Sequence, residues 1–341
     1  MAPFSSPFAL AWTRGLLILP SRQIVYPVHE LEGFILAKVI ALEEHFAHPD
    51  LLAGMPLEPL GTALLDLGER RLAAMDEAGI DLQVISHFPS GAQNLPPEQG
   101  VTLARASNDL LAAAIARHPD RFAGFASLSL AAPHEACAEL ERAVRELGFK
   151  GAMLHGLRSG APLDDKRFWP VFETAAALDV PIYLHPDAPS PEAVEAYYAG
   201  HPVLVGPAWS YTVDTATIAL RLMLCGVLDT YPGLKLILGH MGESLPFSIV
   251  RCDQQVSRRV TLKRRLIDYF HDNFWITTAA NWSTPALVCS IMEMGVERVM
   301  FSVDWPFASN SEGRAFMDAA PISAEDRARI LGGNAATLLR L

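Results

Sequence analysis

The sequence lacks most of the features that mark small secreted, membrane-spanning or nucleic-acid-binding proteins. It has four cysteines in 341 residues and no C-x-x-C pair, which argues against a disulfide scaffold and against a thiolate zinc site. No apolar stretch reaches the roughly 18 residues that a membrane-spanning helix needs. Lys and Arg number 27 against 38 Asp and Glu, and the formal net charge is −11. Binding to nucleic acid or to an anionic membrane is therefore not expected.

The first 37 residues differ in pattern from the rest. An apolar stretch over residues 8–19 is interrupted by Thr13-Arg14-Gly15, and it lacks both a cationic start and an A-x-A cleavage site. We expect residues 1–37 to be a disordered or peripheral leader; an export signal is the alternative. Hydrophobic residues make up 50% of the sequence, enough for a large core. We expect a cytoplasmic protein with a single folded domain over residues 38–341.

From Lys38 onward, short aliphatic or β-branched segments alternate with longer segments of helical period. Eight such strands alternating with helices predict a (β/α)₈ TIM barrel. An open doubly wound sheet is the alternative, but it needs a glycine-rich phosphate turn after the first strand, and none is found there. The predicted strands are Val39–Phe46, Leu82–Phe88, Phe122–Leu130, Phe149–Gly156, Pro181–Pro186, Leu234–Gly242, Phe274–Ala280 and Arg298–Trp305. The predicted helices are Leu64–Ala78, Thr102–Arg117, Glu135–Leu147, Arg167–Leu178, Asp214–Thr230, Pro285–Met294 and a late helix from Ser323 to about Leu331.

Polar residues gather at the ends of the predicted strands, which is where a barrel of this kind carries its chemistry. The first strand ends in Glu43, Glu44 and His45. In an extended strand, Glu43 and His45 share one face and Glu44 lies on the other, so we expect Glu43 and His45 to point into the barrel together. Later strands end in His87, His155, His185, His240 and Asp304.

Any one of these residues alone would be interpreted as an ordinary core or rim residue, but their combination predicts a metal site. Buried carboxylates and imidazoles are costly unless a partner such as a divalent cation compensates them. Glu43 and His45, joined by His185 and Asp304, would form a mixed nitrogen and oxygen site suited to Zn²⁺, Mn²⁺, Mg²⁺ or Fe²⁺. We expect one catalytic divalent ion, Zn²⁺ or Mn²⁺ first and Mg²⁺ as a further candidate, and no organic cofactor.

Several segments in the same order along the chain resemble the metal-dependent decarboxylase branch of the amidohydrolase superfamily, which includes the γ-resorcylate and 2,3-dihydroxybenzoate decarboxylases. Hydrolytic members typically begin with His-x-His, whereas Glu43-Glu44-His45 is similar to the decarboxylase version. The resemblance extends from Lys38 to the C-terminus. The segments that carry it are Ile40–Phe46, Pro181–Pro186, Ile237–Glu243 with Arg251–Asp253, and Phe301–Phe307, supported by Gly206–Trp209 and Gly333–Ala335.

The resemblance implies a carboxy-lyase that removes CO₂ without oxidation from an ortho-hydroxylated aromatic acid. The metal ion would chelate the carboxylate and the phenolic oxygen, and Asp304 would protonate the ring carbon. His240, oriented by Glu243, would set the protonation state near the metal. The substrate-binding residues that the resemblance implies are Arg251, His155, Trp209 and Arg71.

The resemblance also has two departures and leaves one alternative. His155-Gly156 stands where resorcylate decarboxylases usually have Asn-Gly, and the loop His48–Gly61 is shorter and lacks a clear aromatic lid residue; both concern the substrate. The same residues could instead activate water, which would give hydrolysis of a lactone or hydration of a muconate-type diacid. Because related decarboxylases are oligomers, we expect a homodimer or homotetramer, with Arg71 as the candidate residue that reaches a neighbouring subunit.

Overall fold

In the computed structural model, the strands pair in parallel in the order in which they follow along the chain. The structure describes residues 38–52, 60–156 and 161–341. The leader and part of the loop after the first strand lie outside these ranges. The described residues belong to a compact unit, Ala37–Leu341. The strands are β1 Ile40–Phe46, β2 Leu82–His87, β3 Phe122–Gly124, β4 Ala152–His155, β5 Ile182–His185, β6 Leu236–Leu238, β7 Phe274–Thr277 and β8 Val299–Met300.

The strands form two groups that close into one barrel. Parallel ladders join β1 to β3 and β4 to β8. A parallel bridge between Ala126 and Ala152 links the first group to the second. On the other side, the N–H of His45 donates to the carbonyl of Trp305 at 2.7 Å and so connects β1 with the segment after β8. The predicted (β/α)₈ barrel is confirmed.

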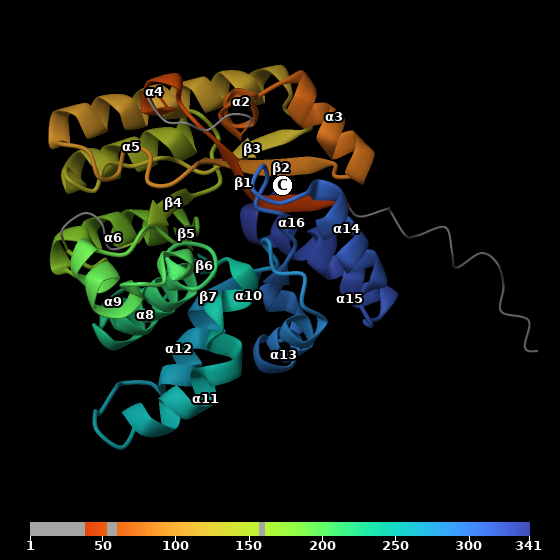
Figure 1. The fold of residues 1–341 in the computed structure, drawn as a ribbon. Helices are drawn as coiled ribbons and strands as arrows, with labels where there is room; N and C mark the ends of the chain where they lie inside the picture. Colours follow the sequence, from red (N-terminus) through yellow and green to blue (C-terminus); the bar gives the residue numbers. More distant parts are fainter. Residues whose placement is uncertain (1–37, 53–59, 157–160) are drawn as a thin grey trace, which may run out of the picture. The chain divides into compact units, whose positions relative to one another are not determined.

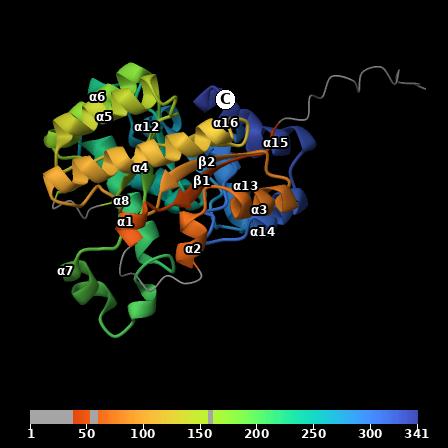
Figure 2. The ribbon, with the colours of Figure 1, turned by 90° about the horizontal axis from the view of Figure 1, so that it is seen from above.

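Helices surround the strands (Figure 1). In Figure 2, α1, α2 and α7 lie on one side of the strands and α16 on the other. Among the described residues, no helix combines the length and apolar character needed to cross a lipid bilayer. The α-helices are α1 Pro49–Leu52, α2 Leu60–Leu65, α3 Glu69–Ala78, α4 Pro97–Arg117, α5 Pro133–Arg145, α6 Trp169–Leu178, α7 Pro191–Ala193, α8 Ser210–Leu224, α9 Val227–Thr230, α10 His240–Glu243, α11 Leu245–Val256, α12 Leu266–Asn273, α13 Thr284–Met294, α14 Asn310–Ala319, α15 Ala324–Ala328 and α16 Asn334–Leu339. Short 3₁₀ or π segments are Lys166–Phe168, Val194–Tyr198, Pro202–Leu204, Val296–Arg298 and Arg329–Gly333.

Two predicted helices are broken in the structure. The segment Leu64–Ala78 is split between α2 and α3 because the carboxylate of Asp66 accepts the N–H of Gly68 at 2.6 Å and ends the first helix. The segment Asp214–Thr230 is split between α8 and α9 at Gly226, whose φ of 90° suits glycine. The helices α11, α12 and α14 were not predicted.

The interior of the barrel is apolar at the end where the strands begin. Ile40, Leu42 and Leu82 pack there with Leu338 and Leu339 of α16. Since this end is filled by hydrophobic side chains, the polar interior is confined to the end where the strands finish. That is the end at which barrels of this kind carry their active sites.

A β-bulge in β1 decides which of its side chains enter the barrel. Ala41 pairs with Gln83 and Glu44 pairs with Ile85, so that Leu42 and Glu43 together face one residue of β2. The extra residue reverses the alternation, as bulges do. Leu42 and Glu43 therefore both point inward, and Glu44 points out of the barrel interior.

Candidate metal centre and active site

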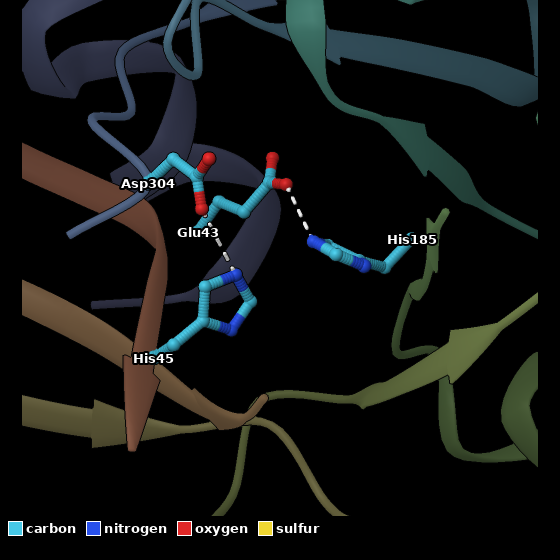
Figure 3. Close-up of side chains that lie close together, drawn as sticks. All are labelled: Glu43, His45, His185 and Asp304. Atoms are coloured by element: carbon cyan, nitrogen blue, oxygen red, sulfur yellow. Dashed lines mark ion pairs between the residues drawn. The ribbon is translucent and has the colours of Figure 1, made fainter. Parts of the chain in front are cut away.

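The four predicted metal ligands converge at the polar end of the barrel (Figure 3). Glu43 and His45 come from β1, His185 ends β5, and Asp304 follows β8. Each offers one ligand atom, and these atoms all lie within 4.8 Å of one another. His45 Nε2 is 3.2 Å from Asp304 Oδ1, and His185 Nε2 is 3.1 Å from Glu43 Oε1.

The unpaired atoms of this cluster fit a divalent cation. Glu43 Oε1 and His45 Nε2 are buried, and beyond their close approaches to His185 and Asp304 neither has a well-directed hydrogen-bond partner among the described residues, which is costly unless another group satisfies them. His185 Nδ1 lies 2.7 Å from the carbonyl oxygen of Pro186; as the N–H donor of that bond it leaves Nε2 free to ligate. Two imidazole nitrogens and two carboxylate oxygens form a donor set suited to Zn²⁺ or Mn²⁺.

The charges of the cluster also suit a cation. Burial raises the pKa of the Glu43 carboxyl, but His240 and His185 outweigh it and hold the pKa below its ordinary value. Burial likewise opposes ionisation of Asp304, yet the imidazoles of His240 and His45 beside it lower its pKa to about 2. Burial lowers the pKa of His45, which keeps this imidazole neutral and able to ligate.

A sharp turn after β6 places His240 beside the cluster. His240 and Glu243 adopt left-handed backbone conformations with φ of 48° and 53°, so the predicted strand through Gly242 ends at Leu238 instead. His240 Nδ1 lies 2.8 Å from Glu243 Oε1, while Nε2 is 3.9 Å from Asp304 Oδ2. Burial lowers the pKa of His240, but the carboxylates of Glu243 and Glu43 raise it well above its ordinary value. His240 therefore holds a proton close to Asp304.

Gly239 leaves the room that the Glu43 carboxylate needs. A Cβ at this position would lie 2.5 Å from Glu43 Oε2. The same oxygen accepts the hydroxyl proton of Tyr183, whose oxygen is 2.7 Å from Thr277 Oγ1. Glu43 is thus held by Tyr183 of β5, which also contacts Thr277 of β7, and it fits beside Gly239 just after β6.

The other predicted substrate-binding residues lie at different depths. His155 ends β4 and is buried, with its ring centre 5.2 Å from that of His185. Trp209 precedes α8 and is half exposed. Arg251 is exposed on α11 and makes no hydrogen bond or ion pair with the described residues of its own chain.

The expectation that Arg71 contacts substrate or reaches a neighbouring subunit is wrong. Arg71 is fully buried on the inner face of α3. Its Nη1 donates to Gln83 Oε1 at 3.1 Å, its Nε donates to the carbonyl of Asp66 at 2.9 Å, and its guanidinium carbon lies 4.1 Å from the ring centre of Trp305. The helical pattern alone does not distinguish this inward position from the exposed one of Arg70.

Sequence reasoning also missed residues that support the site. Tyr183 and Gln83 each lie between two apolar residues within a strand, and that contrast could have identified them. Gln93 binds the end of β4, since its Oε1 accepts the N–H of His155 at 2.8 Å. The position of Gln93 in a loop gives no such signal.

Comparison with known proteins agrees with this fold and site. A family model described as Amidohydrolase matches residues 63–341. The γ-resorcylate decarboxylase of Polaromonas sp. (strain JS666) is 42% identical over 321 residues, which cover 89% of this chain and 98% of that protein. A crystal structure of 2,6-dihydroxybenzoate decarboxylase complexed with 2,6-dihydroxybenzoate superposes with a TM-score of 0.85 at 39% identity, covering 89% of this chain and 100% of that one. A dihydroxybenzoic acid decarboxylase from Polaromonas sp. JS666, with bound manganese and the inhibitor 2-nitroresorcinol, gives a TM-score of 0.85 at 41% identity, covering 89% and 97%.

The fold and the site define a (β/α)₈ barrel with a mixed histidine and carboxylate centre at the C-terminal ends of its strands. The chain belongs to the amidohydrolase family. The resemblance to its branch of metal-dependent decarboxylases, and with it the predicted class of carboxy-lyase, is confirmed.

Proposed function

We propose that this protein is a metal-dependent, non-oxidative decarboxylase of an ortho-hydroxylated aromatic acid of the γ-resorcylate or dihydroxybenzoate type. The observation that carries the proposal is the buried cluster of Glu43, His45, His185 and Asp304, with the proton-holding His240 beside it. A divalent ion held by these four side chains would stabilise a phenolate and a carboxylate on neighbouring ring atoms.

The chain's own residues supply the proton that replaces CO₂. His240 Nδ1 lies 2.8 Å from Glu243 Oε1, and a proton on its Nε2 would lie near Asp304 Oδ2, 3.9 Å away. Asp304 is ionised in the absence of substrate; an anionic substrate beside it favours transfer of that proton to its carboxylate. Asp304 then donates to the ring carbon that bears the carboxylate, the C–C bond breaks, its electron pair returns to the ring, and CO₂ leaves.

The test is direct measurement of CO₂ release. Purified protein loaded with Mn²⁺ or Zn²⁺ is offered salicylate, 2,6-dihydroxybenzoate and 2,3-dihydroxybenzoate, with disappearance of the acid followed spectroscopically. We expect CO₂ and the corresponding phenol in equal amounts. If these acids are inert while lactones or muconates are turned over, the hydrolase or hydratase alternative replaces the proposal.

The exposed face of α11 supports assembly into a homodimer or homotetramer. Phe247 is 87% exposed and Val250 is also exposed, while Met292 on the adjoining helix α13 is 82% exposed. Apolar side chains gathered on one surface mark an interaction site. Arg251 follows Phe247 by four residues and so shares its helix face. We infer that a second copy binds here and that Arg251 meets the substrate carboxylate of that copy.

The compartment that we propose is the cytoplasm. Cys137, Cys225, Cys252 and Cys289 are all free thiols, as a reducing environment would leave them.

Replacing Arg251 by Met should lower kcat/KM at least about tenfold, or some 1.4 kcal/mol, because a guanidinium that holds the substrate is lost. Metal content and thermal unfolding should stay as in the wild type, since Arg251 makes no hydrogen bond or ion pair with the described part of its own chain. Arg258→Met is the matched control, because Arg258 is equally exposed beyond the end of α11. Unchanged kcat/KM, or a monomer by light scattering that turns over at the full rate, would overturn this role.

A further inference from the structure

The backbone of Asp304 adopts a conformation that a non-glycine residue rarely takes. Its φ is 73°, in the left-handed region, where the Cβ crowds the following peptide. This conformation directs the carboxylate toward the barrel axis, with Oδ1 3.2 Å from His45 Nε2. A residue held in such a strained state persists only where surrounding contacts determine it. The backbone N–H groups of the residues on either side of Asp304 show which contacts these are.

Glu44 binds the backbone N–H groups of the two residues that flank Asp304. Its Oε1 accepts the N–H of Val303 at 2.9 Å, and its Oε2 accepts the N–H of Trp305 at 3.1 Å. The carboxylate is fully buried on the face of β1 opposite the metal-binding cluster. It therefore lies away from the four candidate ligand side chains but accepts hydrogen bonds from the backbone of the residues immediately before and after Asp304.

A second layer holds Glu44 in place. Gln83 Nε2 donates to Glu44 Oε2 at 3.3 Å, and Gln83 Oε1 accepts from Arg71 Nη1 at 3.1 Å. Arg71 in turn donates to the carbonyl of His45 and covers the ring of Trp305. The buried Arg71 and Glu44 thus join β1 to the segment after β8, and the bonds from Gln83, Val303 and Trp305 use the Glu44 oxygens as acceptors.

We propose that Glu44 is a positioning residue that fixes the backbone of Asp304. It thereby sets both the orientation of the Asp304 carboxylate and the affinity of the centre for its metal ion. Two peptide N–H groups need two acceptor oxygens, which a carboxylate supplies and an amide does not. The part of the proposal that concerns proton delivery rests on the proposed decarboxylase function; the part that concerns metal affinity does not.

The test is Mn²⁺ binding to the metal-free protein, measured by competition with a chelating indicator. Glu44→Gln keeps the volume of the side chain but brings an NH₂ group against a peptide N–H. We expect the Mn²⁺ dissociation constant to rise at least about tenfold, as for other groups that orient ligands. Where the proposed activity is present, kcat should fall by a similar or larger factor while KM changes less than about twofold, because the aim of Asp304 matters in the transition state.

Glu139→Gln is the matched control. Glu139 is also buried and accepts a hydrogen bond from Asn108 at 2.7 Å, but it lies on α5 and bonds to α4, away from the centre. This variant should lose thermal stability without any change in Mn²⁺ affinity. A merely structural role of Glu44 would give the same result in Glu44→Gln, and that result would overturn the proposal.

Gln83→Leu decides the question if Glu44→Gln fails to fold. It removes the hydrogen bond from Gln83 to Glu44 but leaves the two hydrogen bonds that Glu44 accepts from backbone N–H groups. We therefore expect a smaller rise of the Mn²⁺ dissociation constant, about threefold or more. An unchanged constant in this variant would contradict the proposal. Mn²⁺ affinity is measured without substrate. Absence of CO₂ release from the wild type would therefore reject the proposed function, while the Mn²⁺ affinities of the variants would still decide whether Glu44 is a positioning residue.

Discussion

His185→Ala should give a folded protein that no longer retains a divalent metal ion. His185 supplies one of the four converging ligand atoms, and its bond to the carbonyl of Pro186 presets the nitrogen that faces the centre. Loss of groups that merely orient a ligand costs about 10- to 100-fold in metal affinity, so loss of a ligand should cost about 100-fold or more. Activity should fall by about 10³-fold or more, because the ion contributes several kcal/mol of transition-state stabilisation.

Metal analysis after dialysis, together with circular dichroism, checks this prediction. His87→Ala is the matched control, since His87 is another buried histidine at the end of a strand. Its Nε2 accepts the N–H of His48 at 2.8 Å and takes no part in the cluster. That variant should lose stability but keep its metal. A His185→Ala protein with full metal occupancy and full activity would show that the site is assigned to the wrong residues.

Turnover in D₂O should place one deuterium on the ring carbon that carried CO₂, and Asp304→Asn should abolish it. An amide cannot donate the proton that Asp304 is proposed to deliver, and general acid catalysis is typically worth about 10²- to 10⁴-fold. We therefore expect the rate to fall by about 10³-fold even at saturating metal. Mass spectrometry of the phenol and a stopped assay of CO₂ measure the two effects.

The metal content of Asp304→Asn has to be determined in the same samples, because Asp304 is also a candidate ligand. Activity measured at increasing Mn²⁺ separates the two roles: a pure ligand defect is restored by added metal, whereas loss of the proton donor is not. If Asp304→Asn saturated with Mn²⁺ turned over at the wild-type rate, Asp304 would not be the proton donor. His240, which lies 3.9 Å from it, would then be the group to replace next.

The sequence by itself determined the order of strands and helices and the polar ends of the strands. Alternation of short β-branched segments with segments of helical period is a local property, and so is the N-cap in which the Ser323 hydroxyl accepts the N–H of Asp326 at 3.0 Å. Because strands that alternate with helices place their C-terminal ends on one face, the convergence of Glu43, His45, His185 and Asp304 followed from their positions alone.

The tertiary structure decided which face of β1 carries those ligands. Strict alternation puts Ile40, Leu42 and Glu44 on one face, and since Ile40 and Leu42 line the barrel, it would place Glu44 inside. The bulge opposite β2 reverses this and turns Glu43 inward. A bulge depends on the pairing of two strands and has no signature in either of them, so the sequence showed that Glu43 and His45 share a face but not that this face is the interior.

The same reason explains Arg71, Glu44 and the turn at His240. Each depends on groups distant along the chain: Arg71 on Trp305, Glu44 on the peptides around Asp304, and His240 on Glu43. Burial of a charge is favourable only when all of its partners are in place, and those partners come together only when the barrel closes between β8 and β1. Local pattern therefore indicated which residues are polar, while closure of the barrel decided which of them face the metal centre and which hold it in shape.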